Sequence, residues 1–130
     1  MARILASGDT ALVVEFGDKA ESRLSALVLS LDQRIKQAGI TGIAEMVPTL
    51  RSLMVHYDPV ATSHAVLEEA IRPLLDGLTP DLTPGRRHTI PVCYEPELAP
   101  DLAFVADKTG VAPAEVGRLH ASVVYRVYMI

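Results

Sequence analysis

The chain has 130 residues, of which 49% are hydrophobic and 22% are charged. It contains 12 Lys and Arg residues and 16 Asp and Glu residues, which gives a net charge of −4. This composition is typical of a folded globular protein, and the acidic balance argues against a dedicated nucleic-acid-binding protein. No apolar run reaches the roughly 18 residues that a membrane helix needs, and the interrupted apolar runs at the N-terminus lead us to expect no signal peptide. With Cys93 as the single cysteine, we expect no internal disulfide and a cytoplasmic protein.

The N-terminal part of the chain begins with a predicted hairpin and helix. Short apolar runs on either side of a cluster of turn-forming residues predict strands at 3–6 and 11–16. Apolar residues then recur every three or four positions, which predicts an amphipathic helix. Asp18 and Glu21 have the spacing of a capping box at its start, and Gly39 is placed to end it in a left-handed conformation.

The same pattern is then repeated. Strands are predicted at 43–47 and 53–57, and a second helix, capped by Thr62 or Ser63, is predicted to kink or end at Pro73. The order strand, strand, helix, strand, strand, helix predicts the α+β class. The expected architecture is a small two-layer α/β sandwich with the helices on one face of the sheet.

A change in composition predicts a domain boundary after the second helix. Glycines and prolines without apolar periodicity predict a linker at 81–87, between a domain at 1–80 and a second domain at 88–130. The elements predicted after the linker are a strand at 89–94, helices at 98–108 and 113–121, and a strand at 123–130. About forty residues are too few to form a hydrophobic core of their own. We therefore expect the last apolar strand to be an exposed sheet edge that is prone to association.

Few residues point to chemistry by themselves. The four histidines lack the spacing of metal ligands, so no metal site is predicted, and the sequence contains no P-loop. Cys93, on an apolar strand, is predicted to be a buried, inert thiol. Arg51, at the tip of the second hairpin, could hold an anion or a carboxylate, although a turn-stabilising or surface role is the favoured interpretation. Alternation in the last strand places Arg126 and Tyr128 on one face, where they could line a common pocket.

Several motifs along the chain together resemble one known family. They are GDTAL at 8–12, VEFG at 14–17, Pro48 with RSL at 51–53, YDP at 57–59, IPVCY at 90–94 and YRVYM at 125–129. In this order they resemble the family of the 5-oxoprolinase B subunit, also called allophanate hydrolase subunit 1, which includes the KipI inhibitor of a histidine kinase. The resemblance implies a small N-terminal α/β domain followed by a cyclophilin-like β-barrel. Because the family's barrel continues beyond the position of Ile130, we expect this chain to hold only the first part of it.

The resemblance also implies a function and site residues. The expected role is that of a component, inactive when isolated, which acts with the A and C subunits of a 5-oxoprolinase to open the lactam of 5-oxoproline to glutamate. ATP, bound by the complex, would drive the reaction. The alternatives are a KipI-like inhibitor that binds a sensor histidine kinase and a component related to allophanate hydrolase or urea carboxylase. By motif position, His120, Arg126 and Tyr128 are the candidate catalytic residues, as donors to the carbonyl anion, and Arg51 is the candidate substrate-binding residue.

Overall fold

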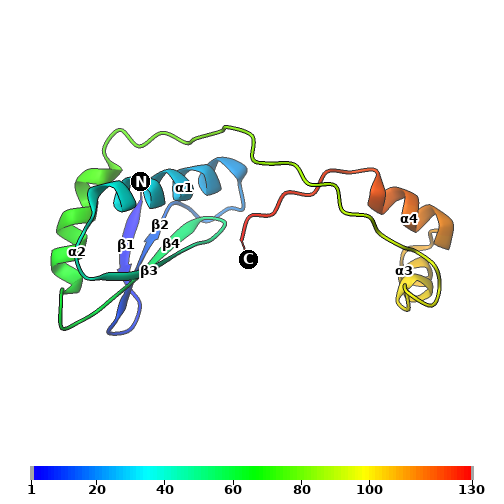
Figure 1. Ribbon diagram of the computed structural model, residues 1–130, viewed down its shortest axis with the longest axis horizontal. Coiled ribbons are helices and arrows are strands. Elements are labelled where there is room, and N and C mark those ends of the chain that lie inside the picture. The colour runs from blue at the N-terminus through cyan, green and yellow to red at the C-terminus, as the bar shows by residue number, and fades with distance from the viewer. Residues whose placement is uncertain (1, 130) are drawn as a thin grey trace. The chain divides into compact units, whose positions relative to one another are not determined.

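The computed structural model describes residues 2–129, which form two compact units (Figure 1). The first unit runs to Pro84 and also includes Tyr128, and the second is Gly85–Val127. Within residues 2–129, no helix is long and apolar enough to cross a membrane.

The first unit is built on a four-stranded antiparallel sheet. The strands are β1 (Arg3–Ala6), β2 (Ala11–Glu15), β3 (Ile43–Pro48) and β4 (Ser52–Tyr57). Their order in the sheet is β1-β2-β4-β3, so two hairpins are joined through the antiparallel pairing of β2 with β4. In that pairing Leu12 lies opposite Val55 and Val14 opposite Leu53. All four strands were predicted from the sequence within one residue at each end.

Two helices, α1 (Ser22–Ala38) and α2 (His64–Ile71), pack on one face of this sheet. The alternation of buried and less buried residues along β4 defines that face, because successive side chains of a strand point to opposite sides. The fully buried side chains form one apolar cluster: Leu12, Val14, Val28, Leu31, Ile35, Leu53, Val55, Leu67 and Ile71. The predicted α+β class, with a two-layer arrangement in the first unit, is therefore confirmed.

The ends of these helices follow the sequence signals only in part. The side chain of Ser63 caps α2 by accepting a hydrogen bond from the backbone N–H of Val66. Pro73 lies in a short 3₁₀ helix, η1 (Arg72–Leu75), which directly follows α2. Gly39 ends α1 in the left-handed region. The predicted capping box at Asp18 and Glu21 is wrong. Glu21 is the N-cap residue, but its side chain makes no cap hydrogen bond, and its backbone carbonyl accepts from the first turn instead.

The second unit contains the helices α3 (Leu102–Thr109) and α4 (Pro113–Ala121). The structure has α4 at its predicted bounds, whereas α3 starts four residues later than predicted, after a turn that contains Pro100. No strand forms at 89–94 or at 123–129, so both strand predictions are wrong for these residues. Ile130, the last residue of the second predicted strand, lies outside the described residues. A strand exists only when a neighbouring segment pairs with it. Neither of these apolar segments has such a partner within residues 2–129, and Cys93, predicted to be buried, is exposed.

Trypsin is expected to cut first at Arg86 and Arg87. Both are exposed, and they lie in a stretch without regular secondary structure, which is where proteases nick folded chains. Arg34 and Lys36 are the internal control, since both lie within α1. Limited digestion followed by mass spectrometry would test this, and equally fast cleavage within α1 would contradict a cooperative first unit.

Candidate functional site

Arg51, the candidate substrate-binding residue, lies in the turn between β3 and β4. In this turn the backbone N–H of Thr49 donates to the carbonyl of Ser52 (2.8 Å), and the hydroxyl of Thr49 also contacts Ser52. The turn directs the Arg51 guanidinium across to the end of β2. There Nη1 donates to the Glu15 carboxylate (2.6 Å) and to the carbonyl of Gly17 (2.5 Å). In this structure Arg51 therefore binds the carboxylate of Glu15, a residue of the same chain. Substrate binding by Arg51 stays a prediction.

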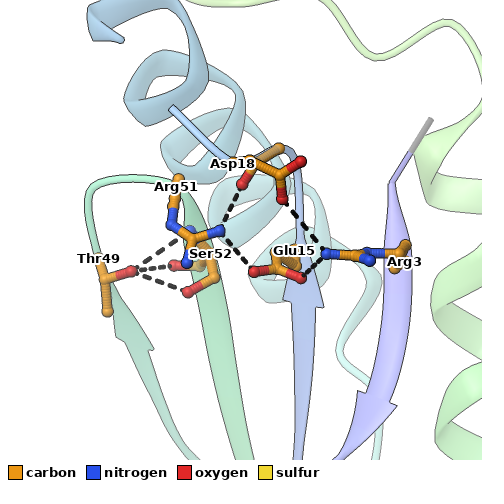
Figure 2. A network of polar contacts seen from close by, with 7 residues as sticks. Arg3, Glu15, Asp18, Thr49, Arg51 and Ser52 are labelled. Atoms are coloured by element: carbon orange, nitrogen blue, oxygen red, sulfur yellow. Dashed lines mark hydrogen bonds and ion pairs between the residues drawn. The ribbon is translucent and has the colours of Figure 1, made fainter. Parts of the chain in front are cut away.

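Glu15 lies between two arginines, as Figure 2 shows. Arg3 of β1 donates to one carboxylate oxygen at 2.6 Å and Arg51 to the other at 2.6 Å, so one side chain ties β1 and β2 to the β3–β4 turn. The hydrogen bond from Arg3, with the positive charges of Arg3 and Arg51, holds the pKa of Glu15 below its ordinary value. The network therefore stabilises the end of the sheet where the two hairpins meet.

The contribution of Glu15 to stability is expected to be lost in acid. A carboxyl whose pKa is lower in the folded than in the unfolded chain stabilises the fold above the unfolded pKa, and this stability disappears as the pH falls through the folded pKa. Glu15→Gln should therefore lower the unfolding midpoint in urea at pH 7, and its difference from the unsubstituted chain should shrink toward pH 3. Glu45→Gln, at an exposed position on β3, is the matched control. A gap between Glu15→Gln and the unsubstituted chain that widens in acid would contradict the assignment.

The candidate catalytic residue His120 lies in the last turn of α4, within the second unit. Its Nδ1 is 2.6 Å from the hydroxyl oxygen of Tyr94. The two rings meet edge to face, with centroids 6.0 Å apart and an interplanar angle of 83°, and the centroid of the Tyr125 ring lies 5.2 Å away. His120 is thus exposed on the helix but in contact with two tyrosine rings.

His120 and Tyr94 also line a groove of about 480 Å³. Its other lining residues are mostly apolar: Leu98, Ala99, Pro100, Asp101, Leu102, Val105 and Val116. A groove with apolar walls and a few polar groups is the usual form of a small-molecule site. An imidazole in such a wall can donate a hydrogen bond to a bound acceptor or accept one from a bound donor.

Arg126 and Tyr128, the other two candidate catalytic residues, stay predictions. Arg126 belongs to the second unit with His120, whereas Tyr128 is grouped with the first unit. Both engage in interactions within the structure. The strand that was expected to place them on one face does not form in the described residues, so their common pocket rests on the family resemblance alone.

Sequence reasoning missed Tyr94 as a partner of His120. The two residues are separated by 26 positions, and the path of the chain between them was not predictable from local pattern. One signal was available, however. Gly117 lies inside a helix, where glycine is unfavourable by about 1 kcal/mol relative to alanine, and such a glycine indicates that another group packs closely against the helix. No group of three or more potential metal ligands occurs among residues 2–129.

The sequence matches a known protein family along nearly the whole chain. Residues 2–130 match the carboxyltransferase domain, subdomain C and D, and the chain belongs to this family. It is 28% identical over 134 residues to the 5-oxoprolinase B subunit of Bacillus subtilis (strain 168), covering 95% of this chain and 56% of the relative. The chain therefore spans little more than half the length of that relative.

Two solved structures extend the comparison. A crystal structure of TTHA0988 superposes with a TM-score of 0.71 at 29% identity, covering 98% of this chain and 23% of that one. The N-terminal domain of the histidine kinase inhibitor KipI from Bacillus subtilis superposes with a TM-score of 0.51 at 21% identity, over 66% of this chain and 95% of that domain. At that identity the second likeness is one of fold alone.

Proposed function

We propose that this chain is the B component of an ATP-dependent lactam hydrolase of the 5-oxoprolinase type, acting with the A and C subunits of that enzyme as its two companions. The observation that carries the proposal is the His120 imidazole, held by Tyr94 in the wall of a groove on a chain related to the 5-oxoprolinase B subunit. Opening a lactam places negative charge on the carbonyl oxygen, and a hydrogen-bond donor at that oxygen lowers the barrier.

In this proposal the chain's own residues orient and protonate rather than attack. His120 donates from its ring to the developing oxyanion, with Arg126 of the same unit, at its family motif position, as a second donor. ATP is a substrate of the assembled complex: the lactam oxygen takes the γ-phosphoryl group and ADP leaves. Water then attacks the carbonyl carbon, the C–N bond breaks as its nitrogen takes a proton, and phosphate is released with glutamate. The chain alone is inactive, because the two companion subunits supply the remainder of the site.

Reconstitution tests this function. The two companion subunits are assayed with and without this chain, and both glutamate and ADP are measured as products of 5-oxoproline and ATP. We expect ATP hydrolysis that depends on 5-oxoproline only when all three proteins are present, and allophanate serves as the competing substrate. An equal rate without this chain would overturn the proposal.

A second candidate function is inhibition of a sensor histidine kinase. It is favoured by the fold similarity between this chain and the N-terminal domain of KipI. Such a regulator needs a complementary surface and no catalytic residue. Added alone to a sensor kinase, the chain would then lower autophosphorylation, and the His120→Gln variant would inhibit equally well.

A further inference from the structure

We infer that Tyr94 is the positioning residue for His120: it occupies Nδ1 and thereby leaves Nε2 as the ring nitrogen presented to substrate. The inference rests on the proposed catalytic role of His120. It begins from the 2.6 Å distance between the Tyr94 hydroxyl oxygen and Nδ1, which is short enough for a good hydrogen bond. Whichever atom donates, Nδ1 is engaged, so Nε2 is the nitrogen left to exchange a proton.

The ring of Tyr94 is itself held in place by α4. A β-carbon added at Gly117 would lie 3.2–3.3 Å from three carbons of the Tyr94 ring, closer than about nine in ten real contacts of this kind. Gly117 is buried, and it precedes His120 by three positions, about one helical turn. The glycine therefore lets the tyrosine ring lie against the helix, and from there its hydroxyl reaches the imidazole one turn further on.

The imidazole is restrained by a second ring as well. The Tyr125 ring centroid lies 5.2 Å from that of His120 at an interplanar angle of 49°, in addition to the edge-to-face contact with Tyr94. Aromatic contacts of this kind favour particular ring orientations. A hydrogen bond at Nδ1, together with contacts that fix the ring, is the arrangement by which enzymes direct a histidine that acts through Nε2.

The first test is spectroscopic and uses the chain alone. Tyr94→Phe keeps the ring and removes only the hydroxyl, and ¹⁵N NMR of the His120 ring reports the hydrogen bonding of Nδ1. We expect the Nδ1 resonance to move in Tyr94→Phe and to stay in place in Tyr125→Phe, which also loses one hydroxyl but meets His120 through its ring. Gly117→Ala, which displaces the Tyr94 ring, should move the resonance as Tyr94→Phe does. An unchanged Nδ1 resonance in Tyr94→Phe would overturn the inference.

The second test measures turnover in the complex assembled with the two companion subunits. Tyr94→Phe is expected to lower kcat about tenfold with KM unchanged, and to cause no further loss when combined with His120→Gln. A tyrosine that only stabilised the fold would instead lower the thermal midpoint and leave kcat unchanged, which would overturn the inference. Full activity of His120→Gln would overturn the proposed role of His120, whatever the NMR result. Loss of activity in His120→Gln with normal kcat in Tyr94→Phe would overturn the role of Tyr94 alone.

Discussion

Leu31→Ala is expected to destabilise the first unit by about 3 kcal/mol, within the range measured for truncating a buried leucine. Leu31 is fully buried (0% exposed) on the face of α1 that packs against the sheet, in the same apolar cluster as Leu12 and Val55. The substitution removes apolar contacts and leaves a cavity that the sheet and helix can only partly close. Because a domain of this size has a total stability of about 5–15 kcal/mol, the effect is a large share of the whole.

Leu29→Ala is the matched control for this prediction. Leu29 lies two residues away in the same helix, carries the same side chain and is 42% exposed. Any effect of alanine on helix propensity is therefore the same at both sites, and only burial differs. Urea unfolding followed by circular dichroism would measure both variants. Equal losses at Leu29 and Leu31 would contradict the burial of Leu31 between α1 and the sheet.

The first unit could be predicted because its signals are local. The strands alternate with period two and α1 repeats its apolar residues with the helical period, so each element reveals its buried face in the sequence. Ser63 caps the start of α2 with its hydroxyl, and Pro73, which lacks a backbone N–H, lies just beyond the end of this helix. The capping box failed because its spacing is a weak signal: the helix began at Ser22 with a backbone acceptor, and Asp18 was left outside the first turn.

The second unit shows the limit of the same reasoning. The apolar segments at 89–94 and 123–129 have strand-like composition, but pairing depends on a neighbour that no local pattern specifies. The exposure of Cys93 is a direct consequence, because the prediction of a buried thiol assumed a paired strand. In the candidate site, His120 was a candidate from its motif position, and its catalytic role stays a prediction. Tyr94 was not singled out, since its contact with His120 depends on how the chain returns to α4.

His120→Gln is expected to lower kcat of the reconstituted hydrolase by about 100-fold or more, in the range that general acid–base groups contribute. Glutamine has a similar size and can donate a hydrogen bond, but it cannot gain and release a proton at neutral pH. Its residual stabilisation of an oxyanion should leave a measurable rate. Because His120 is exposed at the end of α4, the thermal midpoint should change little, so the loss of activity would not reflect unfolding.

His88→Gln separates this effect from a general loss of histidine. His88 is exposed and lies in a stretch without regular secondary structure, so the variant should retain full turnover. Equal losses of turnover in His88→Gln and His120→Gln would trace the effect to the removal of any histidine and would contradict a specific role for His120.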